Sequence, residues 1–299
     1  LQPANPTMPA FVVKELIVQG KVISVMRSYD KRKSLDQISN LTAFSGELKY
    51  LIIKIQEEIK SKFHANKEFD IWKRTEEKPD ENKFFLETSY TFLNEILLLW
   101  VCKDKKLLNF EIIKDYKQLL LLKSDAQKIY SHIFSSNIFD WYIPENFLLQ
   151  EVTNLFNKYD FTLVDRDILG KLYEQFITRE ERKKLGQFYT PESVIDYILD
   201  QIEYTKNIDD KKIIDISCGS GGFTTRATNR LINKLKNNTD NKEIIEKVFS
   251  NVYGMDINPF ACYLAETNML IQLLDLIVEV KKENPKYIIP KIKIFQTNS

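Results

Sequence analysis

Cysteine is scarce in this sequence, and no long apolar run occurs. The 299 residues include three cysteines, Cys102, Cys218 and Cys262, with no C-x-x-C pair. They are too few for a disulfide framework, which fits a reducing cytoplasm. The longest apolar run, residues 96–102, is far shorter than the ~20 residues that a bilayer requires. We therefore expect no signal peptide, no membrane span and no membrane partner.

An excess of charge of one sign is also missing. The chain has 43 Lys and Arg against 42 Asp and Glu, for a net charge of +1. The total does not indicate a nucleic-acid partner, although a balanced total can conceal a basic face. We interpret the basic runs at residues 31–33 and 179–184 as solvated faces. His64 and His132 have no nearby ligand partners in the sequence, so no metal site is expected.

The length and the pattern of apolar residues predict two domains. Residues 34–178 are mostly helical in pattern, with Leu- and Ile-rich segments at 46–63, 88–102, 110–134, 144–161 and 164–177. The polar stretch at 66–83 predicts an exposed loop. We expect residues 1–178 to form an all-α domain.

The second part alternates strands with helices. The sequence predicts helices at 190–203, 223–236, 241–250 and from Pro259 onward, and strands at 212–215, 251–256 and 291–296. Pro191 falls in the first turn of the first of these helices. The alternation favours an α/β fold for residues 179–299, with a parallel sheet covered by helices on both faces.

Three of the chain's 8 glycines fall within residues 219–222, between a predicted strand and a predicted helix. Such a cluster allows positive φ angles or a close approach to the backbone. Ligands of parallel sheets gather at the carboxyl ends of the strands, where Asp215, Asp256 and residues 296–299 fall. Asp256 is our candidate for accepting both hydroxyls of a ribose. The loop lacks the third glycine of G-x-G-x-x-G and the lysine of a P-loop, so a nucleoside is favoured over a pyrophosphate.

Three motifs resemble a known family. "GQFYTP" (186–191), "DISCGSGGF" (215–223) and "GMDINPFACYLAETNM" (254–269) are similar to the cofactor motifs of the DNA adenine-N6 methyltransferases of restriction-modification systems. The similarity is to the branch that places the aromatic-Thr-Pro motif before the glycines, as in type I modification subunits and fused type II enzymes. It covers about residues 164–299, and the helical part resembles the domain that precedes the catalytic domain in those proteins.

The resemblance implies a Rossmann-like methyltransferase domain and S-adenosylmethionine as cofactor. Its methionine part would lie against residues 219–222, its ammonium near Asp215, its ribose at Asp256 and its adenine between Ile257 and Phe260. The implied cofactor-binding residues are Gln187, Phe188, Tyr189, Thr190, Pro191, Glu192, Asp215, Ser217, Cys218, Gly219, Ser220, Gly221, Gly222, Asp256, Ile257, Phe260 and Asn298.

The resemblance further implies methyl transfer to adenine N6 in duplex DNA, in the cytoplasm, with specificity and restriction subunits or domains as partners. The family's catalytic Asn/Asp-Pro-Pro-aromatic tetrapeptide is absent from the sequence. In this family it orients the target amino group and stacks on a flipped base. We therefore assign no catalytic residue, and expect a domain incomplete at its C-terminus, the front of a longer enzyme and inactive alone.

Other interpretations remain open. A related methyltransferase could act on RNA or on a protein glutamine, and a non-catalytic scaffold could bind cofactor or DNA. A nuclease site at Asp36, Glu47 and Lys49 is disfavoured, since that segment has a helical pattern. Asp256 alone could cap a helix, and the glycines could form a plain turn. Cys218 and Cys262 suit packing better than nucleophilic chemistry.

Overall fold

The computed structural model describes residues 32–35, 38–64, 66–76, 78–135, 137–163 and 190–297. The chain divides into two compact units, Leu1–Arg32 and Lys33–Ser299, and every described residue except Arg32 lies in the second. The predicted helix at 164–177 and the predicted domain boundary at 178 lie outside the described residues.

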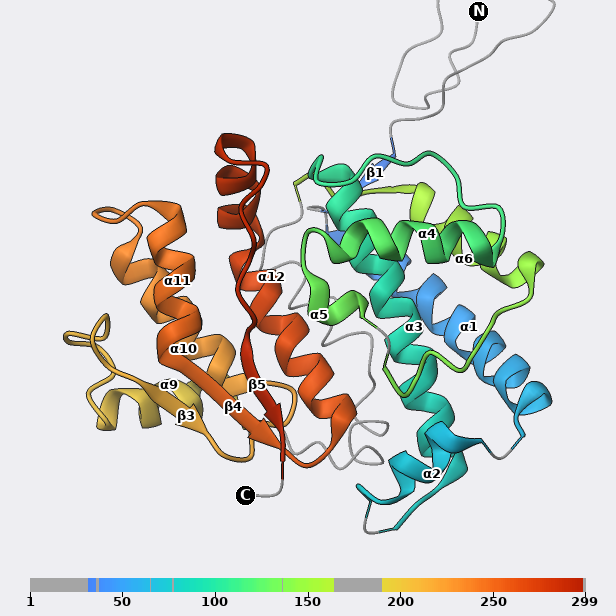
Figure 1. Cartoon of the computed structure of the whole chain (residues 1–299), viewed down its shortest axis with the longest axis horizontal. Helices are drawn as coiled ribbons and strands as arrows, with labels where there is room; N and C mark the ends of the chain where they lie inside the picture. The colour runs from blue at the N-terminus through green and yellow to red at the C-terminus, as the bar shows by residue number, and fades with distance from the viewer. Residues whose placement is uncertain are drawn as a thin grey trace, which may run out of the picture. The chain divides into compact units, whose positions relative to one another are not determined.

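The first part of this unit is built around one buried helix, α3 (Glu81–Asp104). Helices α1 (Ile38–Lys62), α4 (Tyr116–Gln127) and α6 (Asn146–Asn157) contact α3 (Figure 1). The short helices α2 (Lys67–Lys73) and α5 (Ser131–Phe134) complete the part. The strands β1 (Lys33–Ser34) and β2 (Tyr159–Asp160) form a short parallel pair. The predicted helices at 46–63 and 88–102 are confirmed.

The predicted exposed loop at residues 66–83 is wrong, because this stretch contains α2. Asn66 caps the helix by accepting the Phe69 N–H at 2.8 Å, as short polar side chains do at helix starts. Phe69 and Trp72 lie on one face, three residues apart, and both are buried. The charged residues around them concealed this apolar pair.

The single helical segment predicted at 110–134 is also wrong, because α4 and α5 are separate helices. Residues 110–114 have no helical structure. Asp115 accepts the Gln118 N–H at 2.9 Å and so caps α4. This cap, and not the apolar period alone, sets where the helix begins.

The second part is a three-stranded parallel sheet with the order β3-β4-β5. Along the chain come α9 (Glu192–Gln201), β3 (Ile213–Asp215), α10 (Gly222–Leu235), α11 (Asn241–Asn251), β4 (Val252–Asp256), α12 (Pro259–Glu283) and β5 (Lys293–Gln296). Gly254 is paired with both Asp215 and Ile294. The predicted strands and helices of this part are confirmed, with ends that differ by a few residues.

Helices cover only one face of this sheet in the described part of the chain. Val252, Gly254 and Ile294 face α10 and α12 and are buried, whereas Ile214 and Phe295 are 54% and 41% exposed. The strand order explains the difference. Two right-handed crossovers that step in the same direction place their helices on the same face. The prediction of a sheet covered on both faces is therefore wrong for the described residues.

Helix α12 contacts the sheet strands β4 and β5 as well as α3 and α5 (Figure 1). Among the described helices it alone is long and apolar enough to cross a membrane, and 61% of its most apolar window is buried. The core helix of a globular protein can have the same length and hydropathy as a membrane span. Its contacts identify α12 as the core helix that the two parts share.

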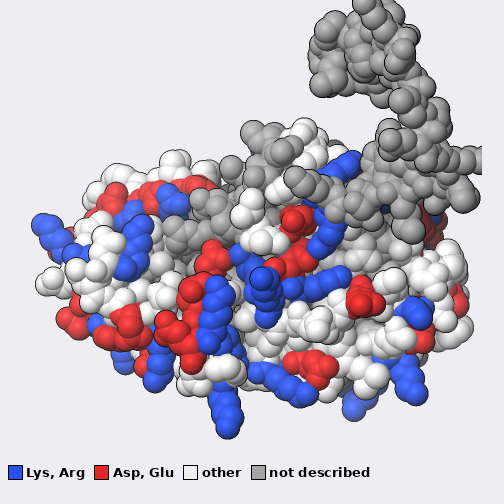
Figure 2. Space-filling view, turned by 90° about the horizontal axis from the view of Figure 1, so that it is seen from above, with Lys and Arg blue, Asp and Glu red and all other residues white. Residues whose placement is uncertain are grey.

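Charges of both signs are interspersed on the face shown in Figure 2. Charged side chains elsewhere in the structure also form ion pairs, such as Lys54 with Glu151 at 2.6 Å and Arg230 with Asp200 at 2.6 Å. The described residues on the face in Figure 2 therefore show no patch of a single charge sign.

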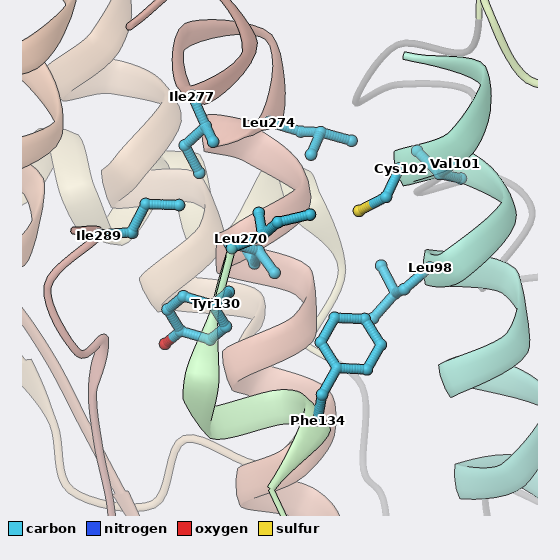
Figure 3. Close-up of a pocket in the computed structure, with 10 residues that line it drawn as sticks. Leu98, Val101, Cys102, Tyr130, Phe134, Leu270, Leu274, Ile277 and Ile289 are labelled. Atoms are coloured by element: carbon cyan, nitrogen blue, oxygen red, sulfur yellow. The ribbon is translucent and has the colours of Figure 1, made fainter. Parts of the chain in front are cut away.

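A small apolar cavity of about 10 Å³ lies between α3, α5 and α12 (Figure 3). Its lining includes Leu98, Cys102, Phe134 and Leu274. The volume is about that of one water probe, and the lining offers no polar partner for a water. Burial raises the pKa of the Cys102 thiol to about 12, which fits a packing role. A cavity of about 10 Å³ is too small to hold a cofactor.

We predict that the stability of the protein falls with rising pH because of Glu87. Its side chain is fully buried, and its Oε2 accepts the Trp72 Nε1–H at 2.7 Å. Burial raises the pKa of Glu87 to about 8, against a smaller opposing effect of Lys83. A raised pKa gives stability that is complete below the unfolded value and is lost as pH rises through the folded value.

Glu87→Gln keeps an acceptor for Trp72 and removes the ionisation. Melting temperatures measured at about pH 6 and about pH 9 should fall more for the wild type than for Glu87→Gln. Equal decreases in the two proteins would show that Glu87 does not titrate in this range.

We also predict opposite effects for two glycine-to-alanine substitutions. Gly221 has φ +89°, and an added Cβ would lie 2.9 Å from Ala265 Cα, so Gly221→Ala should destabilise the fold by about 2–4 kcal/mol. Gly46 lies within α1 with open space around it, so Gly46→Ala should stabilise by about 0.5–1 kcal/mol. Urea unfolding of both variants measures the difference. A stable Gly221→Ala protein would contradict this geometry.

Candidate cofactor-binding site

The glycine turn joins the end of β3 to the start of α10. Gly219 and Gly221 have φ angles of +52° and +89°. A Cβ on Gly221 would collide with Ala265, whereas a Cβ on Gly219 would meet nothing within 4 Å. Gly221 is therefore needed for the packing of α10 against α12. Gly219 leaves open space over the backbone, which suits the approach of a ligand.

Asp256 ends β4 and holds the glycine turn with its carboxylate. Its Oδ2 accepts the Gly219 N–H at 2.9 Å, and its Oδ1 accepts the Asn258 N–H at 2.9 Å. Each carboxylate oxygen can accept two hydrogen bonds, so each keeps one acceptor position. The N-cap of α12 is Asn258, whose Oδ1 accepts the Ala261 N–H at 2.9 Å. The interpretation of Asp256 as a mere helix cap is thus not supported.

Asp215 ends the neighbouring strand β3 and accepts the Ser217 N–H at 3.1 Å. Burial raises the pKa of Asp215, and the charge of Asp256 raises it further. The two carboxylates are therefore close enough to repel each other. A positively charged group placed between them would relieve this repulsion.

The start of α9 is held beside the glycine turn by an ion pair. Asp196 accepts from Arg226 Nε at 2.8 Å, and this hydrogen bond contributes most to lowering the pKa of Asp196 to about 2. An added Cβ on Gly222 would lie 3.2 Å from Ile195 Cδ1. These contacts keep residues 190–192, which precede and begin α9, close to the loop.

Hydrogen bonds of Gly219 to Asp256 and of Cys218 to Met255 join the glycine turn to the end of β4, and residues 190–192 precede and begin the helix whose Ile195 lies beside Gly222. Gln187, Phe188, Tyr189 and Asn298 lie outside the described residues. Ile257 is 47% exposed, whereas Phe260 is buried with its ring centroid 6.4 Å from that of Tyr90 and 6.0 Å from that of Phe139. Ile257 thus offers an accessible apolar surface, and Phe260 packs into the core behind it.

Both predicted packing cysteines are buried near the site. The Cys218 N–H donates to the Met255 carbonyl at 2.8 Å and fastens the loop to β4. Burial raises the pKa of Cys218, and it raises the pKa of Cys262 to about 12. Neutral thiols of this kind are poor nucleophiles.

Sequence reasoning missed three residues that shape this site. Asn268 of α12 donates through Nδ2 to the Ser220 carbonyl at 2.8 Å, and Asn258 donates through Nδ2 to Glu76 Oε1 at 2.6 Å. An Asn-Pro pair before a long helix is a signal that could have identified Asn258 as a cap. No local signal exists for Asn268 or for Glu76, which is 182 residues away from Asn258.

The disfavoured nuclease residues lie elsewhere. Glu47 is on α1, where it accepts from Lys158 Nζ at 2.8 Å and from Tyr159 Oη at 2.8 Å. Asp36 lies outside the described residues. Among the described residues, no group of three or more His, Cys, Asp or Glu side chains is arranged to hold a metal ion.

Residues 164–284 match the family model described as N-6 DNA Methylase. The EcoEI methylase subunit, a type I restriction enzyme subunit of Escherichia coli, is 26% identical over 145 residues, which are 48% of this chain and 28% of that protein. The HindI methylase subunit of Haemophilus influenzae is 34% identical over 113 residues, 37% of this chain and 23% of that protein. The type II restriction enzyme and methyltransferase RM.Eco57I of Escherichia coli is 30% identical over 190 residues, 50% of this chain and 18% of that protein.

Among solved structures, a modification subunit of a putative type I restriction enzyme from Vibrio vulnificus is similar with a TM-score of 0.42 and 16% identity, over 85% of this chain and 56% of that one. The chain spans less than a third of the length of the curated relatives given above. The match and these relatives confirm the resemblance that the motifs indicate. Residues 164–284 of the chain are thus similar to the N-6 DNA methylases and to methylase subunits of restriction enzymes.

Proposed function

We propose that the protein binds S-adenosylmethionine at the carboxyl edge of its sheet and serves the methylation of adenine N6 in duplex DNA, as part of restriction-modification. The observation that carries this proposal is the carboxylate of Asp256. Each of its oxygens keeps one acceptor position, directly beside the open backbone at Gly219. A ribose with two neighbouring hydroxyls matches this arrangement.

The described residues fit the other parts of the same cofactor. Gly219 would admit the methionine part against the backbone, and Asp215 would lie near its ammonium, which would also offset the repulsion from Asp256. Ile257 would cover one face of the adenine, and Thr190 would offer a hydroxyl from the start of α9. When bound, S-adenosylmethionine supplies a methyl group on a positively charged sulfur. The protein would hold and orient it.

The proposed methyl transfer requires residues besides those that would bind the cofactor. The sequence contains no Asn/Asp-Pro-Pro-aromatic tetrapeptide, so no described residue is assigned to orient the target amino group. We propose that residues 179–299 are part of a Rossmann-like methyltransferase domain that supplies the cofactor site, with residues 1–178 as a helical domain before it. Adenine N6 as the target, duplex DNA, and specificity or restriction partners belong to the proposed whole protein.

The relatives favour DNA as substrate over RNA or a protein glutamine. They include methylase subunits of type I restriction enzymes and an adenine-specific methyltransferase, PglX, of Streptomyces coelicolor. A cofactor-binding scaffold without chemistry is the alternative that the missing tetrapeptide leaves open. It would share the site geometry and differ only in the absence of methyl transfer.

We predict that Asp256→Ala weakens the binding of S-adenosylmethionine by about 10- to 150-fold, because a charged hydrogen bond of about 1.5–3 kcal/mol is lost. Gly219→Ala should also weaken binding, because its added methyl group would occupy the open space over the backbone. Isothermal titration calorimetry of folded protein measures both effects.

Asp210→Ala is the control for Asp256→Ala, because Asp210 is exposed and its substitution removes the same charge. Gly46→Ala is the control for Gly219→Ala. Both controls should bind like the wild type. Unchanged affinity in Asp256→Ala, or equal losses in a variant and its control, would remove the assignment of this site.

We also predict that this chain alone transfers no methyl group to DNA. Incubation with labelled S-adenosylmethionine and an adenine-containing duplex should leave the DNA unlabelled, because the residues that orient the target amine are missing from the sequence. Label in N6-methyladenine would show that catalytic residues lie within the 299 residues.

A further inference from the structure

Two carboxylates of the helical part, Glu76 and Glu87, lie beside the Asn258 side chain that follows Asp256, and Glu76 is the one to which Asn258 donates directly from Nδ2. Glu76 follows α2, and its Oε1 accepts from Asn258 Nδ2 at 2.6 Å. Its Oε2 forms an ion pair with Lys83 Nζ, which lies in the first turns of α3. The side chains of Lys83 and Glu76 are only 13% and 9% exposed. In such a place a hydrogen bond to a charged group is little weakened by solvent.

Hydrogen bonds to a buried residue hold the turn that precedes Glu76. The Thr75 N–H and hydroxyl both bond to the Trp72 carbonyl, at 2.9 Å and 2.7 Å, and the Trp72 ring is fully buried. Trp72 in turn donates from Nε1 to the buried Glu87 at 2.7 Å. The turn that presents Glu76 is therefore anchored in the core of the helical part.

Asn258 links Glu76 to Asp256 through hydrogen bonds to both residues. Its Oδ1 accepts the Ala261 N–H at 2.9 Å to cap α12, so its Nδ2 is turned toward Glu76. Its own N–H donates to Asp256 Oδ1 at 2.9 Å. With both ends of its amide held, the backbone of Asn258 has little freedom to turn its N–H away from Asp256.

We propose that Glu76 is a positioning residue for the candidate cofactor site and acts on Asp256 through Asn258. This inference rests on the proposed function for the identity of the ligand. The helical part then contributes to cofactor affinity without touching the cofactor. A merely structural Glu76 would stabilise the fold and leave the Asp256 loop unchanged.

The first test follows the loop itself, without ligand. Residue-resolved amide hydrogen exchange should show faster exchange of the Asn258 and Gly219 N–H groups in Glu76→Ala than in the wild type, since both donate to Asp256. Amides in the middle of α6 should exchange equally in the two proteins. The control is Glu57→Ala, which removes an exposed carboxylate from α1 and should change none of these rates.

The second test measures S-adenosylmethionine binding by calorimetry below the unfolding temperature. Glu76→Ala should raise the dissociation constant by about two- to 150-fold, the range for residues that share one hydrogen-bond network. Glu57→Ala should leave it unchanged.

A pair of substitutions that swaps donor and acceptor tests the hydrogen bond between Asn258 and Glu76 directly. Asn258→Asp keeps the cap acceptor but faces the Glu76 carboxylate with a second one, so it should weaken binding and speed exchange of the Gly219 amide. Adding Glu76→Gln places an amide donor at position 76 opposite the carboxylate acceptor at position 258. The double variant should therefore recover binding and protection relative to Asn258→Asp alone.

The outcomes separate the two proposals. If the wild type does not bind S-adenosylmethionine but Glu76→Ala still loosens the Asn258 and Gly219 amides, the proposed function fails and the positioning role stands. If the wild type binds and Glu76→Ala changes neither the affinity nor these amides, or if the double variant recovers nothing, the positioning role of Glu76 is overturned.

Discussion

The arrangement of the described unit depends on the burial of α12 from two sides. Its apolar residues pack on the sheet and on α3 and α5, and polar side chains of α12 form hydrogen bonds and an ion pair with the helical part. Tyr130 donates to Glu266 at 2.6 Å and accepts the Ile292 N–H at 3.1 Å, and Lys105 pairs with Asp275 at 2.6 Å. These bonds fix the register between the helical part and the sheet.

This register has a direct effect on the site. The start of α12 is the end of the loop that carries Asp256, so a helix held on both sides also holds the loop. Asn268, in the same helix, holds the glycine turn through Ser220 at 2.8 Å. The candidate site is thus formed by two strand ends and stabilised by a helix that leads away from it. Such sites on rigid elements keep a precise geometry.

The elements next to the site could be predicted from sequence because their signals are local. A short β-branched strand, a glycine cluster at residues 219–222 and a proline at the start of a helix each depend on a few neighbouring residues. The short helix α2 was missed because its two buried aromatics, Phe69 and Trp72, are surrounded by charges. The contact of Glu76 with Asn258 could not be predicted, because the two residues meet only once the chain has folded.

The face of the sheet that no described helix covers has a consequence for handling the protein. Ile214 and Phe295 are exposed on that face, and β3 and β5 are the outer strands of the described sheet. Outer strands with unpaired backbone groups beside exposed apolar side chains are templates for adding strands of other chains. Aggregation of this chain in concentrated solution would therefore start at the sheet, and a lysine at position 214 or 295 is the substitution to try first for keeping it dispersed.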